Sequence, residues 1–462
     1  MCLVFKSKLF VILSTLFILA ALGVGVYLVG IKTGFIKHAS GIPANLVLDV
    51  GTSFVSPADC WRNLAQGGES KSRMLSSVIP QVKNLHPQYI RIDHIYDNYD
   101  VVSKDGQGHL NFNWATLDAT VNDILATGAK PFFSLSYMPP AISKDGQVTS
   151  LPTNWADWQL VVQKTIEHYS GRSGMNLSNV YYEVWNEPDN FGKFSPGNYL
   201  DIYFYAQNGA KSASGVNSFK IGGPATSGLY KSWLDAMLTA AQNGKIRLDF
   251  FSWHDYYSDA DRYDSDVTSL SSWLASYPNF QNMELVVSEM GIDSKNNPAY
   301  DNNLSAINTI SGVTSLQINT NKCFSFEIVD GAGPQKLWGR WGILTNEKYG
   351  TPEPKTRYYA LQFLNQMIGD RMSVTGSGTW VKAFARYDTK NIRVLVSNYA
   401  PDGHSEVVPF KMINIPYNNF TFKRINFLGG TTTQSVATDS GTWETTLPFT
   451  PNTAAVFEIT PQ

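Results

Sequence analysis

The sequence predicts an α/β protein in which a (β/α)8 TIM barrel is followed by a C-terminal all-β sandwich domain and preceded by an N-terminal transmembrane helix. Three observations lead to this fold class. Residues 9–31 are almost continuously apolar. Between residues 45 and 370, short apolar runs alternate with segments of helical periodicity, as in parallel sheets. From 375 to 462, strand patterns and turns follow one another without helices. We therefore expect a membrane segment (1–38), a barrel (45–370) and a sandwich (375–462).

The N-terminal segment has the charge and length of a membrane anchor. Lys6 and Lys8 precede an apolar run from Leu9 to Ile31, which is long enough as a helix to cross a bilayer core of about 30 Å. A cleaved signal peptide has a shorter apolar core and a small-residue cleavage site, and neither is evident here. We expect an uncleaved anchor with the catalytic part outside the cytoplasm, periplasmic or extracellular. A cleaved signal peptide with secretion is the alternative.

The central segment contains eight strand candidates. Helical patterns separate them, so parallel pairing is expected, and eight such units in roughly 320 residues suggest a closed barrel. A doubly wound open sheet is the alternative, but no glycine-rich phosphate loop follows the first strand. The eight candidates are Leu46–Val50, Tyr89–Asp93, Lys130–Ser136, Val180–Trp185, Lys220–Gly223, Leu248–His254, Glu284–Glu289 and Cys323–Ile328.

Two of the intervening helices are clear from the spacing of their apolar residues. One apolar face is formed by Trp114, Leu117, Val121, Ile124 and Leu125, with Asn113 as the expected N-cap. A second is formed by Trp155, Trp158, Val162, Ile166 and Tyr169.

The C-terminal part changes in character after Arg371. A polar, glycine-rich stretch from Ser373 to Thr379 is expected to join the two domains. The strands expected after it, most simply arranged as a sandwich, are Trp380–Arg386, Asn391–Asn398, Glu406–Met412, Phe420–Asn426 and Ala454–Ile459.

Composition excludes some partners. A formal net charge of −2 and a pI near 6.4 leave no basic stripe, so nucleic acid is not an expected partner. Aromatic residues make up 13% of the chain, which fits either a large core or a cleft that stacks on sugar rings. No His/Cys spacing typical of zinc is present, and we expect neither a metal nor a cofactor. Cys60 and Cys323 are free to pair in an oxidising compartment, and the sequence leaves this open.

Two glutamates end predicted strands. The strand Val180–Trp185 continues into Asn186 and Glu187, and Glu289 ends the strand that begins at Glu284. Catalytic groups of parallel barrels lie at the C-terminal ends of strands, so both carboxyl groups should meet at the mouth. A protonated carboxyl facing an ionised one is what cleavage of a glycosidic bond requires. A salt bridge at the rim is the alternative for either residue alone.

These residues carry a resemblance to a known family. Trp185-Asn-Glu-Pro188, with a second glutamate 102 residues later, resembles the retaining hydrolases of glycoside hydrolase clan A. The finer resemblance is to glycoside hydrolase family 39, the group of β-xylosidases, α-iduronidases and exopolysaccharide hydrolases. It covers roughly residues 45–370 and includes the sandwich. Its further motifs are Tyr89–Asp93, Asn113–Asp118, Gly128–Phe132, Gly222–Ala225 and Trp253–Tyr256.

The resemblance implies roles for the matching residues. Glu187 would be the general acid/base and Glu289 the nucleophile of a retaining mechanism, with carboxyl groups about 5–5.5 Å apart. Asn186 would bind the sugar 2-hydroxyl, and Tyr256 would hold Glu289 ionised through a phenol hydrogen bond. His254 would contact the substrate, or be a hydrogen-bonded core histidine.

Several further residues are candidates for the site. Arg91 should lie near Glu289 and lower its pKa, unless its role is purely structural. Tyr137 and Trp338 are expected to contact substrate, although packing is the alternative for Tyr137. Glu183 is expected inside the barrel. Glu327 is either a substrate contact or part of an ion pair.

The acidic segment from Asp259 to Asp266 lacks the glycine and the terminal glutamate of a calcium loop of the EF-hand type. We expect a solvated acidic loop there.

The sequence therefore predicts a membrane-anchored glycoside hydrolase that cleaves β-glycosidic bonds by double displacement, with a cell-envelope or exported polysaccharide as the expected substrate. An exo-acting β-xylosidase is the alternative within this class. A catalytically inactive carbohydrate-binding surface protein is the alternative from another class, but both glutamates are present.

Overall fold

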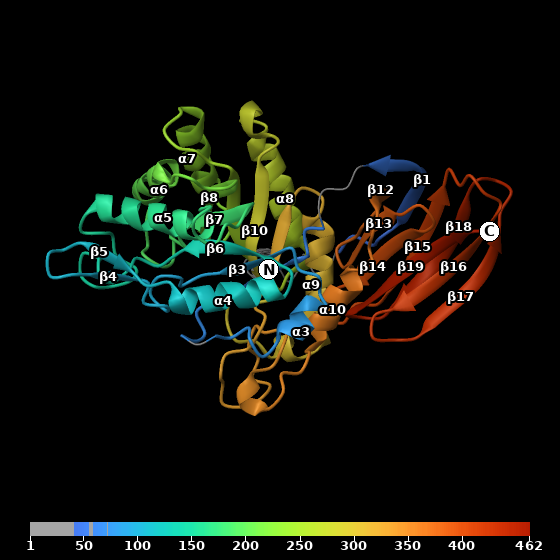
Figure 1. Cartoon of the computed structure of the whole chain (residues 1–462). Helices are drawn as coiled ribbons and strands as arrows, with labels where there is room; N and C mark the ends of the chain where they lie inside the picture. Colours follow the sequence, from blue (N-terminus) through green and yellow to red (C-terminus); the bar gives the residue numbers. More distant parts are fainter. Residues whose placement is uncertain (1–40, 55–58, 72) are drawn as a thin grey trace, which may run out of the picture.

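The computed structural model describes residues 41–54, 59–71 and 73–462. They form a barrel surrounded by helices and, beside it, a domain made of strands (Figure 1). The predicted membrane span at residues 9–31 lies outside the described residues. Within the described part, no helix has the length and apolar character needed to cross a bilayer.

The barrel consists of eight parallel strands that close on themselves. Around the ring they follow the order β10, β11, β2, β3, β6, β7, β8, β9, with β9 pairing back to β10. The strands are β2 (Asn63–Gln66), β3 (Tyr89–Ile92), β6 (Lys130–Leu135), β7 (Val180–Val184), β8 (Phe219–Thr226), β9 (Phe250–Tyr256), β10 (Glu284–Gly291) and β11 (Lys322–Phe326).

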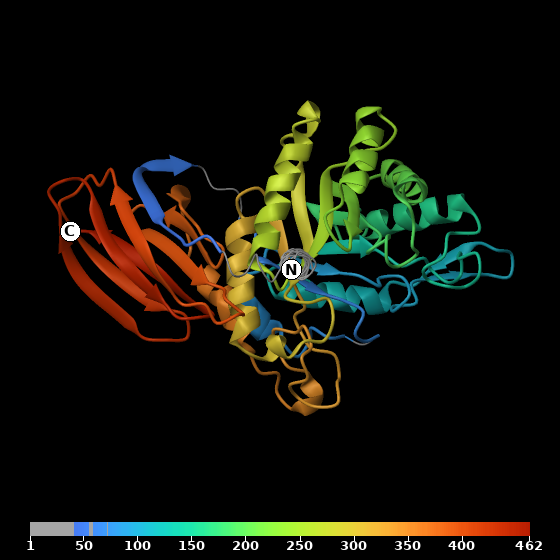
Figure 2. The same ribbon diagram turned by 180° about the vertical axis from the view of Figure 1, so that it is seen from behind.

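Helices follow the barrel strands and cover the outside of the ring (Figures 1 and 2). Both helices that were predicted in detail are present. The N-cap of the first is Trp114, not Asn113 as predicted, whereas Asn154 caps the second by accepting a hydrogen bond from the Ala156 amide. The α-helices are α3 (Ile79–Lys83), α4 (Ala115–Ala126), α5 (Trp155–Tyr169), α6 (Pro196–Ser212), α7 (Lys231–Gln242), α8 (Ala260–Leu274), α9 (Asn303–Leu316) and α10 (Thr356–Leu364). Short elements in the connections are the hairpin β4 (Val102–Lys104) and β5 (Leu110–Phe112) and the 3-10 turns η1 (Pro278–Phe280), η2 (Pro298–Asp301) and η3 (Glu347–Tyr349).

The first barrel strand was predicted wrongly. The strand that begins at Leu46, β1 (Leu46–Phe54), belongs to the other domain, where it pairs antiparallel with β12 and parallel with β15. The barrel begins instead at β2, which is only four residues long. Leu46 and Leu48 are fully buried in the core of the second domain. The apolar residues of β1 are therefore buried in the second domain and not in the barrel.

The second domain is one nine-stranded sheet in the order β17, β16, β19, β14, β13, β12, β1, β15, β18. The sheet folds over so that its ends face each other, since Phe422 of β16 packs 4.8 Å from Trp443 of β18. It is therefore a sandwich, as predicted. Its remaining strands are β12 (Asp370–Thr375), β13 (Val381–Tyr387), β14 (Ile392–Asn398), β15 (Glu406–Ile413), β16 (Asn419–Asn426), β17 (Thr431–Ala437), β18 (Trp443–Phe449) and β19 (Thr453–Pro461).

The expected join between the domains is itself partly a strand. β12 occupies residues 370–375 and so includes the start of the polar stretch Ser373–Thr379. Alternating serine and threonine residues fit the exposed face of a strand as well as a linker. The strands β12, β17 and β18 were not predicted.

Side chains fill the interior of the barrel. Phe132, Tyr181, Phe250 and Phe324 meet at its centre, with ring centroids of neighbouring pairs 4.8–5.5 Å apart. The barrel is consequently a packed core whose open end lies above this aromatic layer, as in other (β/α)8 barrels.

The two domains are joined by packing as well as by the chain. Trp61, just before β2, packs 5.9 Å from Phe384 of β13 and lies under the Arg386 guanidinium. Lys382 forms an ion pair with Asp264 of α8, and the Tyr399 hydroxyl donates to the Ser258 carbonyl. The sandwich therefore braces the barrel.

Candidate active site

A pocket of about 700 Å³ opens at the C-terminal ends of the barrel strands. Glu187, Glu289, Asn186, Tyr137 and Tyr256 all line it. The prediction that the two glutamates meet at the barrel mouth is confirmed. A second groove, of about 630 Å³, lies in the sandwich and has a mostly apolar lining without a facing pair of carboxyl groups.

Glu187 is positioned by an unusual backbone at the end of β7. Trp185 and Glu187 have φ angles of +75° and +45°, a conformation that non-glycine residues adopt at a cost of about 1–3 kcal/mol. The Ser134 hydroxyl donates to the Trp185 carbonyl at 2.8 Å, and the Glu187 amide donates to the Ala225 carbonyl at 2.8 Å. These contacts with neighbouring strands hold the turn that directs Glu187 into the mouth.

Glu289 lies near the end of β10 and accepts two strong hydrogen bonds. Arg91 Nη1 donates to Glu289 Oε1 at 2.8 Å, and the Tyr256 hydroxyl donates to Oε2 at 2.6 Å. Both donors favour the ionised carboxylate. The predicted proximity of Arg91 and Tyr256 to Glu289 is confirmed.

Arg91 organises the floor of the site. Its guanidinium is buried and also donates to Glu183 Oε2 at 2.7 Å and to Asn186 Oδ1 at 2.8 Å. Asn186 in turn donates to the Tyr137 hydroxyl at 2.7 Å. Glu183 is fully buried within the barrel, as predicted. One arginine thus fixes the orientation of the nucleophile candidate and of the neighbouring amide.

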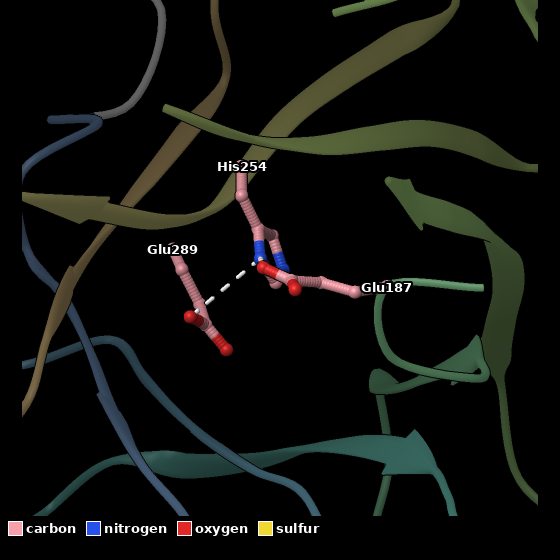
Figure 3. A group of neighbouring side chains, drawn as sticks. All are labelled: Glu187, His254 and Glu289. Atoms are coloured by element: carbon pink, nitrogen blue, oxygen red, sulfur yellow. Dashed lines mark hydrogen bonds and ion pairs between the residues drawn. The ribbon is translucent and has the colours of Figure 1, made fainter. Parts of the chain in front are cut away.

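His254 lies between the two glutamates (Figure 3). Its Nδ1 is 2.9 Å from Glu187 Oε1 and 3.6 Å from Glu289 Oε2. One ligand atom from each of the three side chains lies within 4.8 Å of the others. Among the described residues this is the sole group that converges closely enough to hold a metal ion, but the Arg91 guanidinium at Glu289 already supplies a positive charge there. The arrangement suits proton transfer better than metal binding.

The three groups influence one another's protonation. Burial raises the pKa of Glu289, and His254 and Arg91 only partly offset this. Burial would also raise the pKa of Glu187, but the hydrogen bond and charge of His254 lower it below its usual value. Burial alone would lower the pKa of His254, whereas the two carboxylates raise it. The three groups are therefore electrostatically coupled, and the His254 ring lies directly beside Glu187.

The aromatic residues around the pocket differ partly from those predicted. Tyr137 lines the pocket, but Trp338 does not. Trp338 lies against Gly333, and the Arg340 guanidinium is 5.3 Å from its ring centroid. The loop after β11 turns the neighbouring Trp341 toward the pocket instead, where it packs 5.2 Å from Phe326.

Neither role predicted for Glu327, a substrate contact or part of an ion pair, is found among the described residues. The side chain is fully buried and does not line the pocket. Its Oε2 accepts a hydrogen bond from Gln66 Nε2 at 2.9 Å, and no basic group of the described residues forms an ion pair with it. Burial raises its pKa well above the usual value.

The structure overturns one further prediction and answers a question that the sequence left open. The acidic segment from Asp259 is a helix, not a loop. Asp259 caps α8, and the Asp266 carboxylate accepts from the Tyr257 hydroxyl at 2.7 Å. Cys60 and Cys323 lie side by side, since the Cys323 amide donates to the Cys60 carbonyl at 2.7 Å, but both are free and buried.

Several pocket residues were missed by sequence reasoning. All lie at the end of a barrel strand or in the loop that follows it. That position is the signal that could have found them. They are Glu69, Asp93, His94, Phe191, Lys295 and Arg340.

Comparison with known proteins agrees with this geometry. The sequence pattern of Glycosyl hydrolases family 39 matches residues 63–388. The chain belongs to this family. The protein is therefore a glycoside hydrolase. The matched segment runs from the first residue of β2 into the sandwich.

Individual relatives in family 39 are distant. A beta-xylosidase from Caldicellulosiruptor saccharolyticus is 24% identical over 347 residues, which are 68% of this chain and 69% of that protein. The crystal structure of a family 39 enzyme from Xanthomonas axonopodis pv. citri has a TM-score of 0.71 at 18% identity, covering 92% of this chain and 99% of that one. A monomeric beta-xylosidase from Caulobacter crescentus has a TM-score of 0.70 at 19% identity, covering 90% and 99%. At these identities the structures establish a shared fold.

Proposed function

We propose that the protein is a retaining β-glycosidase that removes sugars from chain ends, with a β-xyloside as its first expected substrate. The observation that carries the proposal is the separation of Glu187 and Glu289, whose nearest carboxylate oxygens lie within 4.8 Å. Carboxyl groups about 5–5.5 Å apart allow direct attack on the sugar, whereas inverting enzymes need about 6.5–9.5 Å to admit a water molecule.

In the first step, a Glu289 oxygen attacks the anomeric carbon while the glycosidic C–O bond breaks. Arg91 and Tyr256 keep Glu289 ionised for this attack. Glu187 gives its proton to the departing oxygen, and the sugar remains on Glu289 as an ester. Asn186, held by Arg91 and Tyr137, is placed to bind the 2-hydroxyl as positive charge develops on the sugar.

In the second step, Glu187 takes a proton from water. The water oxygen bonds to the anomeric carbon, and the bond to Glu289 breaks. The product keeps the configuration of the substrate, because the carbon has been inverted twice.

His254 supplies the proton that the first step requires. Burial would raise the pKa of Glu187, but the hydrogen bond and the charge of His254 lower it. Transfer of the proton across the 2.9 Å contact yields a protonated Glu187 and a neutral imidazole. His254 is a positioning residue that acts through Glu187.

Contacts that join three loops on one side of the pocket mouth support cleavage at chain ends. Arg340, in the loop after β11, donates to Asn296 Oδ1 at 2.8 Å in the loop after β10 and pairs with Glu69 in the loop after β2. Its guanidinium also lies 3.3 Å above the Trp341 ring. Three loops are tied together there, which favours a pocket over an open groove. The preference for a β-xyloside comes from the beta-xylosidase relatives.

The test is a set of aryl β-glycosides offered to the protein, with β-xyloside, β-glucoside and β-galactoside compared. We expect Glu289→Ala to abolish measurable turnover and Glu444→Ala, a change at an exposed glutamate of the sandwich, to keep it. NMR of the first-formed sugar should show the β-anomer. An α-anomer from a β-glycoside would refute the retaining mechanism, and silence on every glycoside and polysaccharide with carbohydrate binding retained would favour a non-catalytic binding protein.

The apolar run at residues 9–31 supports a further proposal about location. It would hold the catalytic domain on the outer face of a membrane, where a cell-envelope or exported polysaccharide would be at hand. The protein could release oligosaccharides from an intact polysaccharide without turning over aryl monosaccharides. That result would favour internal cleavage of such a polymer over removal of sugars from its chain ends. Fractionation of cells that express the full chain tests the location, and activity confined to the soluble cytoplasmic fraction would refute it.

A further inference from the structure

Asp93, directly after β3, places a carboxylate in the pocket wall. The residue is only 7% exposed and lines the pocket beside Glu289. Its Oδ1 is covered from water and has no hydrogen-bond partner among the residues that the structure describes. It lies so close to the backbone of Gly67 that a Cβ there would be 1.7 Å away. Buried carboxylates are normally satisfied, so Oδ2 is left to bind a donor that enters the pocket.

His94, the next residue, presents the complementary donor. Its Nδ1 lies 2.8 Å from Asp97 Oδ2, and the other oxygen of Asp97 accepts from the Tyr137 amide at 3.2 Å. Burial would lower the pKa of His94, but Asp93 and Asp97 outweigh it and raise the pKa to about 9. The ring is therefore charged at neutral pH. Because Nδ1 is engaged, Nε2–H is the donor available to the pocket.

The positions of Asp93 and His94 in the ring of strands place both side chains beside the bound sugar and away from the bond that breaks. Glu187 follows β7 and Glu289 lies on β10. On one side, β8 and β9 separate them, and His254 and Tyr256 fill that short arc. The longer arc contains β11, β2, β3 and β6. A sugar ring held between the two glutamates must extend over the longer arc, where Asp93 and His94 lie.

We propose that Asp93 and His94 bind the neighbouring C3 and C4 hydroxyls of the sugar that Glu289 attacks, and so recognise an unsubstituted chain end. This inference rests on the proposed glycosidase function. Each hydroxyl is both a donor and an acceptor: one donates to the Asp93 carboxylate and the other accepts from the His94 imidazolium. The 2-hydroxyl is left to Asn186. A branch or ester on either hydroxyl would remove the donor and leave the carboxylate buried and unpaired.

A purely structural role for Asp93 makes a different prediction. In that case the carboxylate only sustains the charge on His94 and contributes to the field at Glu289. Its loss would then slow every substrate equally and move the pH profile. Binding of a hydroxyl, in contrast, makes the penalty depend on which hydroxyl the substrate carries.

The experiment compares kcat/KM for 4-nitrophenyl β-xyloside and its 2-, 3- and 4-deoxy analogues in the wild type, Asp93→Asn and His94→Gln. Asp189→Asn is the matched control, because it removes one charge from the same pocket at the far wall, where Asp189 accepts from the Ser227 amide. For the parent xyloside, we expect Asp93→Asn to lower kcat/KM by about 10- to 150-fold, the range for a hydrogen bond to a charged group. For one of the 3- and 4-deoxy analogues the loss should shrink to less than about 3-fold. The penalty on the 2-deoxy analogue should remain, and Asp189→Asn should show no such dependence on the analogue.

Each outcome decides the matter. A penalty in Asp93→Asn that is equal for all four substrates overturns the inference and leaves the glycosidase function intact. A wild type inactive on every glycoside, behaving like Glu289→Ala, overturns both. If Asp93→Asn fails to fold, as thermal unfolding would show, His94→Gln carries the test alone, and an equal penalty across the analogues in that variant overturns the inference.

Discussion

The hydrogen bond from Tyr256 to Glu289 can be tested through the acidic limb of the pH profile. The Tyr256 hydroxyl lies 2.6 Å from Glu289 Oε2 and stabilises the ionised carboxylate. A hydrogen bond to a charged group contributes about 1.5–3 kcal/mol, and one pKa unit corresponds to about 1.36 kcal/mol. Tyr256→Phe should therefore raise the pKa of Glu289 by about 1–2 units. Because Glu289 must be ionised to attack, the acidic limb of kcat/KM moves to higher pH by the same amount.

The assay is kcat/KM for an aryl β-xyloside between pH 3 and 9, since this ratio reports the ionisation of the free enzyme. Tyr263→Phe is a suitable control, because that hydroxyl lies within hydrogen-bond distance of the Gly291 carbonyl at the end of the same strand and of the Asn308 side-chain amide, both of them uncharged. Its acidic limb should stay in place. An unshifted acidic limb in Tyr256→Phe, or an equal shift in both variants, would refute the assignment of the phenol to Glu289.

Three further predictions follow from the same structure. Glu187→Ala should slow aryl glycosides with poor leaving groups far more than those with good ones, and azide should restore turnover with a β-glycosyl azide product. Equal slowing, or an α-azide seen by NMR, would contradict its role. Phe324→Ala, in the aromatic centre of the barrel, should lower the free energy of unfolding by about 3–5 kcal/mol. A urea titration measures this loss, and one below about 1 kcal/mol would contradict the packing. Burial raises the pKa of Asp330 from 3.8 to about 6, against the effect of Lys355. The protonated form is favoured on folding, so its stabilisation is complete below pH 4 and is lost as the pH rises through 6. Asp330→Asn should flatten the pH dependence of unfolding between pH 4 and 7, and an unchanged slope would rule out this titration.

Most of the barrel could be predicted because its strands are buried on both sides. Seven of the eight proposed barrel strands overlap those observed, and helices lie between them. The exception is instructive. β2 reads Asn63-Leu-Ala-Gln66, which is too short and too polar at its ends to show a period. β1 begins with the apolar run Leu46-Val-Leu48, yet a local pattern cannot show which of two sheets it joins.

The candidate site was predictable to the extent that its residues lie on strands. Glu289, His254, Tyr256 and Arg91 meet as expected because strand direction and spacing fix where they point, and Glu187 joins them from the turn directly after β7. The loop residues could not be placed in this way. Trp338 and Trp341 are three apart, and contacts of Arg340 with two other loops decide which of them reaches the pocket. No pattern within one loop encodes an interaction with another.

The place of β1 in the sandwich affects how the protein is made. β1 lies between β12 and β15, and the Ala44 amide next to it donates to Glu406, 362 residues later. At a synthesis rate of about 5–20 residues per second, the first strand waits about 20–70 s for the partners that cover Leu46 and Leu48. During that time the barrel between them can form, while the early strand remains an unpaired apolar edge. The sandwich is thus completed last, from strands that lie near both ends of the described chain.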